Sequence, residues 1–572
     1  MPSLAVADRS PLVREHRSLV ARLFAFVERS HGRACAALVA LALVCFLPGF
    51  VSLQPMDRDE PRFAQASKQM LETGDFVDIR FQSEARHKKP VGIYWLQSAA
   101  VGAAEGLGAH NARTTIAFYR VPSLVGALAT VLLTYWAALA FLTRRAALLA
   151  AAFLAASLIL MVEARLAKTD AVLTACSVAA MGGLARAYLA RGAARLPTGT
   201  VLVFWAAVAL GILIKGPMVV VFAGVAGLVL SVRERSPRWL LALRPGLGLA
   251  LTAVIVAPWF VAIASKTGGA FYAEAVGHDM LGKVGTAQTY HWAPPGFYFI
   301  AFFATFWPAA ALAAIAAPTV WTKRRDDVYA FALAWTVPTW LILEAVPTKL
   351  PHYTMPLLPA IAIATVAAMT RGDVGPHRWG AKPVALLMPF IPIGLTAVLA
   401  YATWTLDGTL PLAALPLLLV ACILSVMAYR LFGRREISGA ALANVAAAAV
   451  LAVGIFGFVQ PVLQSLKLSP RLVQAAQAAG CPEPQIGTLG YREPSLVFLA
   501  GTGMAMLDDA RGAARFLASG GCRVAFVERR FETDFKDAVA EADVRPSLAS
   551  RVAGFNINGG RRVDIGTYVV RP

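Results

Sequence analysis

The chain has 572 residues, of which 58% are hydrophobic and only 15% are charged. A soluble protein of this length would carry far more charge, so the composition excludes an ordinary soluble protein and favours a helical membrane protein with many spans. The formal net charge of +20 raises the alternative of a nucleic-acid-binding protein. However, the arginines lie in short loops between apolar runs, where the positive-inside rule and anionic lipid headgroups explain them better. We therefore expect membrane lipids, and no nucleic acid, as partners.

The first apolar run follows a long basic stretch with arginines from Arg9 to Arg33. This stretch is too long for the start of a secretory signal peptide, and no small-residue cleavage site follows the run. We expect an N-terminus that is not cleaved and that stays in the cytoplasm.

Apolar runs recur along the chain, and most are long enough to cross about 30 Å of hydrocarbon as a helix. They predict about thirteen transmembrane helices with approximate ends. The predicted spans are Ala36–Leu53, Val121–Leu142, Ala146–Val162, Ala171–Leu189, Val201–Ile214, Met218–Val232, Leu247–Ala264, Phe297–Ala317, Val328–Val346, Met355–Met369, Val384–Thr405, Leu410–Tyr429 and Ala440–Val459. The sequence indicates neither inverted repeats nor broken helices, which are frequent in transporters.

The apolar segment Val91–Leu107 is predicted to lie at the membrane interface, although it could form a short span. Counting it as a span would reverse the orientation of everything after it. The charges argue against this, because without it every second loop is basic, as the positive-inside rule requires. The basic loops are Arg144-Arg145, Arg191/Arg195, Arg233–Arg244, Lys323–Arg325, Arg371–Lys382 and Arg430–Arg435. The C-terminus is then expected outside.

Composition changes after residue 464, so we predict a transmembrane domain over residues 1–464 and a small outer α/β domain over residues 465–572. Its expected strands are Ile486–Leu489, Val497–Leu499, Val524–Val527 and Val563–Val570, with a helix near Asp508–Leu517. Two of the six cysteines, Cys481 and Cys522, fall in this domain. They could form a disulfide if the domain is periplasmic, which the sequence leaves open.

The outer loop after the first span carries Asp59, Glu60 and Arg62 around Pro61. Acidic residues before a proline are typical of a helix N-terminus, which is a purely structural explanation. A carboxylate here could also act as a general base toward a hydroxyl group. Both interpretations stay open.

Further charged and polar residues lie in the other outer segments. Arg86-His87-Lys88-Lys89 precedes the interfacial segment, where its cations could reach lipid headgroups or bind a phosphate. The remaining residues are Asp170 in the loop Glu163–Asp170, Lys215 before Gly216-Pro217, His278 in the segment Ala273–Thr289, and Lys349, His352 and Tyr353 at the start of the tenth span. Ionisable residues at membrane depth are costly, so their repeated placement on one face predicts a polar cavity for an anion and a hydroxylated substrate.

These segments resemble the motifs of the ArnT-like aminoarabinose transferases, which are GT-C membrane glycosyltransferases related to the protein O-mannosyltransferases. The resemblance is carried, in chain order, by Asp59-Glu60-x-Arg62, Gly74-Asp75, Lys89-Pro90 with Tyr94-Trp95, Thr169-Asp170, Lys215-Gly216-Pro217, Pro258-Trp259 and Lys349-Leu350-Pro351-His352-Tyr353. It implies a GT-C fold, an α-helical polytopic membrane protein with about thirteen transmembrane helices and a small periplasmic α/β domain.

The resemblance also implies roles for individual residues. Asp59 would be the main catalytic carboxylate and Asp170 a second one. Arg62, Lys89 and Lys215 would bind the donor phosphate, and the cavity would be lined by Glu60, Lys88, His278, Lys349, His352 and Tyr353. The chain departs from the family at Lys88, where an acidic residue is usual, and at Val91-Gly92. Lys88 cannot supply the metal ligand that an acidic residue would.

The expected activity is transfer of a sugar from a polyprenyl (undecaprenyl) phosphate to lipid A or another envelope acceptor, at the periplasmic face of the bacterial inner membrane. The cations would stabilise the leaving phosphate, and Asp59 would deprotonate or orient the acceptor hydroxyl for displacement with inversion. No cofactor and no metal site are predicted, while a need for a divalent metal, the sugar, the acceptor and the oligomeric state stay open. The alternatives are a protein O-mannosyltransferase-like enzyme and a transporter or flippase of lipid-linked sugars.

Overall fold

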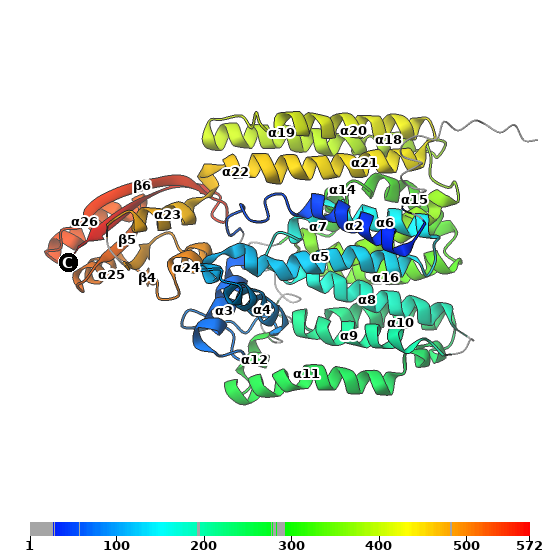
Figure 1. Cartoon of the computed structure of the whole chain (residues 1–572), viewed down its shortest axis with the longest axis horizontal. Coiled ribbons are helices and arrows are strands. Elements are labelled where there is room, and N and C mark those ends of the chain that lie inside the picture. Colours follow the sequence, from blue (N-terminus) through cyan, green and yellow to red (C-terminus); the bar gives the residue numbers. More distant parts are fainter. Residues whose placement is uncertain are drawn as a thin grey trace, which may run out of the picture.

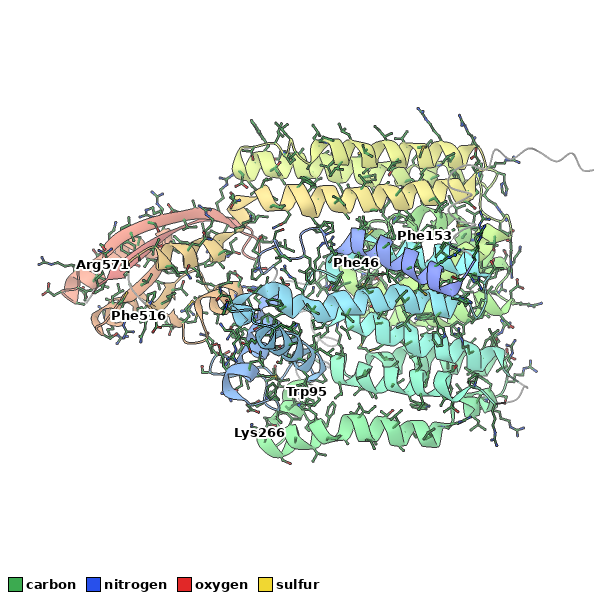
Figure 2. The ribbon with its side chains drawn as sticks, in the orientation of Figure 1. Phe46, Trp95, Phe153, Lys266, Phe516 and Arg571 are labelled. Atoms are coloured by element: carbon green, nitrogen blue, oxygen red, sulfur yellow. The ribbon has the colours of Figure 1, made fainter. Side chains whose placement is uncertain are left out.

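The computed structural model describes residues 27, 29–56, 58–191, 195–275, 277, 282, 292–480 and 483–571. Most of it is a bundle of long helices that run side by side, with a small α/β part at one end (Figure 1). The fully buried Phe46 and Phe153 lie inside the bundle, whereas Phe516 and Arg571 belong to the α/β part (Figure 2). His278 and Cys481, which the sequence singled out, lie outside the described residues.

Nine helical segments in the described part of the chain are long and apolar enough to cross a membrane. They are α5 (Ile116–Ala138), α8 (Asp170–Leu189), α9 (Thr198–Lys215), α11 (Pro245–Thr267), α16 (Asp327–Ala345), η4 with α17 (Pro351–Thr370), α18 with α19 (Ala381–Asp407), α20 (Leu415–Gly433), and α21 with η5 and α22 (Ile437–Val462). Three shorter apolar helices, α2 (His31–Phe46), α10 (Met218–Arg233) and α15 (Ala310–Thr322), lie in further predicted spans. The predicted class, a helical membrane protein with many spans, is confirmed, and the exact number of spans stays a prediction.

Two of the predicted spans are broken into shorter helices. Ala146–Val162 forms α6 (Arg144–Ala155) and α7 (Leu158–Glu163), and Phe297–Ala317 forms α14 (Phe297–Thr305) and α15. Pro308, which cannot continue a hydrogen-bonded helix, lies between α14 and α15. The two breaks meet, because the Leu158 N–H donates to the Trp307 carbonyl at 3.1 Å and so satisfies backbone groups that the breaks leave free. The expectation of unbroken helices is therefore wrong, and it no longer argues against a transporter.

The predicted basic loops lie at one end of the bundle and contact one another. Arg191, after α8, binds Asp327 at the start of α16 at 2.6 Å. Lys323, after α15, binds Asp373, after α17, at 2.7 Å. The basic face that the sequence predicts is thus one face of the structure, while the compartment that it faces stays a proposal.

At the opposite end lie α3 (Asp59–Thr73) and α4 (Gly92–Gly106), next to the α/β part (Figure 1). They are joined by a short hairpin of β1 (Arg80–Phe81) and β2 (Glu84–Ala85). Helix α4 is the segment predicted to lie at the interface, and it is not among the apolar helices of spanning length in the described chain. Its first residue, Gly92, packs on the end of α9, where a Cβ atom would come within 2.7 Å of the Leu213 carbonyl oxygen.

The α/β part contains a five-stranded sheet in the order β4-β3-β5-β7-β6. Its elements are α23 (Leu468–Gln477), β3 (Gln485–Leu489), α24 (Pro494–Ala500), β4 (Ala505–Leu507), α25 (Ala510–Ala518), β5 (Arg523–Glu528), α26 (Glu532–Glu541), β6 (Ser547–Asn556) and β7 (Arg561–Val570). Strand β3 is parallel to β4 and β5, and β7 is antiparallel to β5 and β6. Along β5, Val524 and Phe526 join one apolar cluster while Ala525 and Val527 join another, so both faces of the sheet are covered.

Most of the expected elements of this part are present, with one error. The expected strand Val497–Leu499 is wrong, because these residues lie in α24. So short an apolar run has no recognisable period, and Pro494 occupies the first turn of the helix, where proline is tolerated. Strands β4 and β6 were not predicted. Cys522 is disulfide-bonded, a point that the sequence left open.

The α/β part is fixed to α3 by residues in and around α24. Gln65 Nε2 donates to Thr502 Oγ1 at 2.7 Å, and Lys68 Nζ donates to the Phe498 carbonyl at 3.2 Å. These contacts hold the start of the first outer loop between the helix bundle and the sheet.

Candidate active site

The two predicted carboxylates of the first outer loop, Asp59 and Glu60, lie in the first turn of α3. Carboxylates are favoured there, because a helix N-terminus carries partial positive charge. Glu60 is fully buried, lies 2.7 Å from Arg120 Nε of α5 through Oε1, and accepts the Ala167 N–H at 2.9 Å. Glu60 therefore ties three segments together. The resemblance implied that it lines the cavity, but in the structure its side chain is fully buried.

A second set of charges lies where α8 begins and α9 ends. Asp170, the first residue of α8, accepts from Nζ of Lys215, the last residue of α9, at 2.5 Å. In the loop before α8, Lys168 Nζ lies 3.1 Å from Glu163 Oε1. The exposed fractions of these four side chains are only 14% or less, so both ion pairs are shielded from water.

His352 lies between the two carboxylates of this set. Its Nδ1 is 3.5 Å from Glu163 Oε1, and its Nε2 is 3.7 Å from Asp170 Oδ2. The ring of the next residue, Tyr353, lies 5.1 Å from Lys215 Nζ, within range of a cation–π contact. The start of the tenth predicted span thus lies next to the first residue of α8 and the last residue of α9.

Asp59 lies within electrostatic reach of the same set. Burial alone would raise the pKa of its carboxyl, but the positive charges of Arg86, Lys168 and Arg62 outweigh burial and lower the pKa below its ordinary value of 3.8. Asp170 opposes this shift, because it is a like charge close by. Asp59 is therefore an ionised carboxylate at neutral pH, held by charges that act through space.

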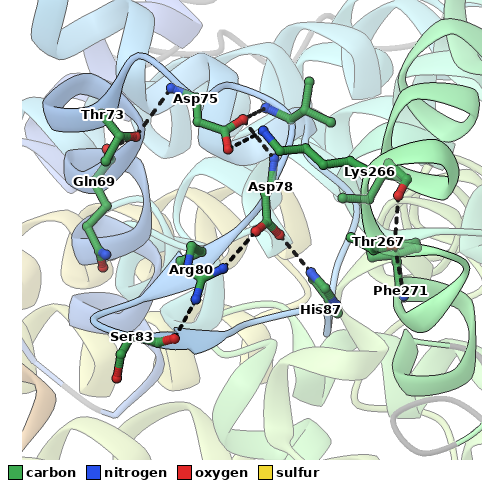
Figure 3. Close-up of polar contacts among 12 residues, drawn as sticks. Gln69, Thr73, Asp75, Asp78, Arg80, Ser83, His87, Lys266, Thr267 and Phe271 are labelled. Atoms are coloured by element: carbon green, nitrogen blue, oxygen red, sulfur yellow. Dashed lines mark hydrogen bonds and ion pairs between the residues drawn. The ribbon is translucent and has the colours of Figure 1, made fainter.

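The segment between α3 and α4, which contains the hairpin and Arg86, is held by several polar contacts, and two of them tie it together before and after the hairpin (Figure 3). Asp75 accepts from Nζ of Lys266 on α11 at 2.5 Å. Asp78 Oδ1 lies 2.8 Å from His87 Nε2. The segment that leads to Arg86 is therefore tied to α11 through Asp75, and His87 is tied to Asp78.

The structure brings six of the predicted residues into one cluster: Asp59, Arg62, Asp170, Lys215, His352 and Tyr353. Lys88 is exposed, and Lys89 is half-buried just before α4. Lys349 is buried, and its Nζ donates to the Val346 carbonyl at 2.7 Å.

Three residues of the cluster were not among the predicted site residues: Arg86, Glu163 and Lys168. Glu163 and Lys168 were recognised only as charges of a short loop, and Arg86 only as one of several cations. Arg120, the partner of Glu60, was missed entirely. The sequence did indicate Arg120, because it is an arginine at the start of an apolar run, and such a residue needs a partner when it is buried.

Among the described residues, no group of three or more His, Cys, Asp or Glu side chains has the geometry to hold a metal ion. A hollow of about 960 Å³ lies between α19 and the sheet, and it is lined by arginines such as Arg529, Arg530 and Arg562 together with Asp407. None of the predicted site residues lines this hollow.

Three comparisons with known proteins agree with this architecture. The family described as dolichyl-phosphate-mannose-protein mannosyltransferase matches residues 89–261. An undecaprenyl phosphate-alpha-4-amino-4-deoxy-L-arabinose arabinosyl transferase of Erwinia tasmaniensis is 28% identical over 308 residues, which cover 53% of this chain and 54% of that protein. The protein of the same description from Pectobacterium carotovorum is 26% identical over 347 residues, 59% of this chain and 58% of the relative. The chain thus spans little more than half the length of these curated relatives.

Two crystal structures of ArnT from Cupriavidus metallidurans have the same fold. The apo structure superposes with a TM-score of 0.69 at 19% identity, covering 93% of this chain and 97% of that one. The structure bound to undecaprenyl phosphate superposes with a TM-score of 0.70 at 20% identity and the same coverage. The chain therefore has the fold of these ArnT structures, and in this chain the fold comprises an apolar helical bundle and a small C-terminal α/β part. More particularly, the chain is ArnT-like, and the resemblance predicted from its motifs is confirmed.

Proposed function

We propose that this protein is an integral membrane glycosyltransferase that moves a sugar from a polyprenyl phosphate to a hydroxyl group of lipid A or of another envelope acceptor. The proposal places the cluster and the α/β domain at the periplasmic face of the bacterial inner membrane, with the N-terminus in the cytoplasm. One observation carries it: ionisable side chains from α3, the loop before α8, α9 and η4 converge at one end of an apolar bundle. The similarity to arabinosyl transferases that use undecaprenyl phosphate supports this choice of donor.

The mixed charges suit the chemistry of a lipid-phosphate leaving group. The acceptor hydroxyl oxygen attacks the anomeric carbon, the bond from that carbon to the phosphate oxygen breaks, and the phosphate leaves with the bonding electrons. Arg62 and Lys89 stabilise the charge that develops on the phosphate. Asp59 accepts or orients the hydroxyl proton, and displacement from the opposite side inverts the configuration.

The ion pair of Asp170 with Lys215 affects which carboxylate can act as the base. Because Asp170 contacts Lys215 at 2.5 Å, much of its charge is already compensated, which leaves Asp59 as the better base. Lys215 brings a cation to the same place, where it reaches the phosphate only in competition with Asp170. His352 and Tyr353 border this pair and form the wall of the sugar site.

A second candidate is a protein O-mannosyltransferase-like enzyme, in which the acceptor hydroxyl belongs to a protein. The match to the family of dolichyl-phosphate-mannose-protein mannosyltransferases over residues 89–261 favours it. The two candidates share the donor class and differ in the acceptor.

The deciding experiment incubates the purified protein in detergent with polyprenyl-phosphate sugars that carry a labelled sugar, together with an extracted lipid A fraction or an envelope protein fraction. We expect label in the lipid fraction, whereas label in protein would favour the second candidate. No labelled product with any donor, together with movement of the donor across sealed vesicles, would overturn both in favour of a transporter. Mass spectrometry of envelope glycans with and without the gene then identifies the sugar and the acceptor.

A further inference from the structure

Arg86 has an unusual environment for a charged side chain. Only 8% of the residue is exposed, yet its Nε is buried without a hydrogen-bond partner among the described residues. Its guanidinium carbon lies 5.0 Å from the centre of the Phe63 ring on α3. A buried guanidinium loses its hydration, and one aromatic face returns only part of that loss. The site therefore has an unmet need for an acceptor.

The backbone holds Arg86 firmly in this position. Its N–H donates to the Ile79 carbonyl at 2.7 Å, and its own carbonyl accepts the Lys88 N–H at 2.9 Å. The next residue, His87, is fixed by Asp78 at 2.8 Å (Figure 3). The backbone that carries Arg86 is thus fixed in advance of any ligand, which lowers the entropy lost on binding.

A second guanidinium, that of Arg62, lies close to the first. Arg62 projects from α3 one residue before Phe63, and it is half-buried. Burial and the positive charges of Arg86 and Arg58 lower the pKa of Arg62, whereas the carboxylates of Asp59 and Glu493 raise it, so the two guanidinium groups of Arg62 and Arg86 repel each other. The repulsion between two like charges that are largely removed from water is relieved when an anion binds between them.

We propose that Arg86 is a phosphate-binding residue of the donor site, and that Arg86 and Arg62 together bind two oxygens of one phosphate. The inference rests on the proposed function, since the phosphate is that of the lipid donor. The sequence indicated only that the cations of the segment Arg86–Lys89 could bind lipid headgroups or a phosphate, and the resemblance implied Arg62, Lys89 and Lys215 as the phosphate-binding residues. The inference assigns this role specifically to Arg86.

Arginine suits this task better than lysine. Its planar guanidinium presents several N–H donors in a fixed fork that matches two oxygens of a phosphate, and each bond is strengthened by charge. The Phe63 ring holds the plane of the Arg86 fork, while Nε remains available as a donor. A phosphate bound here would lie next to Asp59, where the acceptor hydroxyl must be oriented.

The test is direct binding of a polyprenyl phosphate to the purified full-length protein in detergent, with the uncharged polyprenol of the same length as the reference ligand. No sugar and no acceptor are present. The variants are Arg86→Met, which keeps an apolar stem over Phe63 and removes the guanidinium, and Arg86→Lys, which keeps the charge and removes the fork. The control is Arg80→Met, the same change on the same hairpin at a side chain that is 47% exposed.

We expect Arg86→Met to weaken binding of the phosphate about 10- to 100-fold, the worth of a charge-assisted hydrogen bond, and to leave polyprenol binding unchanged. Arg86→Lys should lose less affinity for the phosphate than Arg86→Met does. Arg80→Met should bind both ligands as the unmodified protein does. Unchanged phosphate binding in Arg86→Met would overturn the inference, and so would an equal loss for phosphate and polyprenol, because that result indicates packing. If Arg86→Met does not fold, the same two criteria apply to Arg86→Lys.

The outcome is distinguishable from failure of the proposed function. A protein that binds polyprenyl phosphate through Arg86 but forms no glycosidic bond would refute the transferase and retain this binding site. A protein that transfers sugar normally while Arg86→Met binds the donor normally would refute only this inference.

Discussion

Asp59 and Asp170 belong to one cluster but are held differently. Asp170 is in direct contact with Lys215, so its charge is compensated by a cation at 2.5 Å, and the His352 ring lies 3.7 Å away. Asp59 is stabilised by Arg86, Lys168 and Arg62 through space. A carboxylate that is ionised and makes no direct ion pair within the described part of the chain is the better acceptor for the proton of an incoming hydroxyl.

Replacing Asp59 by Asn therefore tests the base. The change keeps the shape and removes the charge, so we expect the transfer rate to fall about 100-fold or more, the usual worth of a general base. The melting temperature should change little. Initial rates in the detergent assay measure the effect, and Glu84→Gln, which removes an exposed carboxylate from the same outer loop, is the control. Near-normal turnover in Asp59→Asn would make Asp170 the leading candidate.

At the scale of elements, one buried ion pair holds the first outer loop to the bundle. Arg120 donates to both carboxylate oxygens of Glu60, at 2.7 and 3.0 Å. It also donates to the carbonyls of Phe50, Leu53 and Gln54, at 2.7 to 3.0 Å. The chain between α2 and α3 is thus folded around one guanidinium.

Glu60→Gln should strongly destabilise the protein, because it leaves the Arg120 charge buried without its partner. We expect the free energy of unfolding to fall by about 3–5 kcal/mol, measured by denaturant titration. The control is Glu105→Gln, which breaks the pair of Glu105 with Arg113, whose side chains are 33% and 42% exposed. That change should lower the free energy of unfolding by less than about 1 kcal/mol. Equal effects of the two substitutions would show that the buried pair has no special structural role.

The contact between α4 and α9 is a second determinant at this scale. A methyl group at Gly92 would lie 2.7 Å from the Leu213 carbonyl oxygen, so Gly92→Ala must push the helices apart and displace Lys215, two residues further on. We expect a loss of about 1–3 kcal/mol of unfolding free energy, together with reduced transfer. Gly102→Ala on the same helix meets nothing within 4 Å and should be neutral or slightly stabilising. If Gly92→Ala changed neither the free energy of unfolding nor the transfer rate, this contact would not position the site.

For the whole molecule, the proposal requires that the basic end of the bundle faces the cytoplasm. A reporter that is active only in the periplasm should be inactive when fused within Arg233–Arg244, and active when fused after Ser465. The disulfide at Cys522 fits an oxidising compartment for the α/β domain. The reverse reporter pattern would place the cluster in the cytoplasm and contradict the proposed function.

The sequence by itself determined the class of the protein, the ends of the bundle and much of the site. Long apolar runs and alternating basic loops are local features of the sequence. The first predict membrane-spanning helices, and the second predict which ends of those helices share one face. Asp59, Asp170 and Lys215 could be named in advance because each is a charge at the end of an apolar segment.

Only the tertiary structure decided which of these charges serve the cluster and which hold the fold. Asp59 and Glu60 are neighbours in sequence, yet α3 directs Glu60 to Arg120 and leaves Asp59 to Arg86 and Lys168. The breaks at Ser157 and Pro308 also belong to this level, because one hydrogen bond between the two segments, from the Leu158 N–H to the Trp307 carbonyl, satisfies a backbone group of each. Such pairings join residues far apart in the chain, and a charge in a sequence does not indicate which distant partner will compensate it.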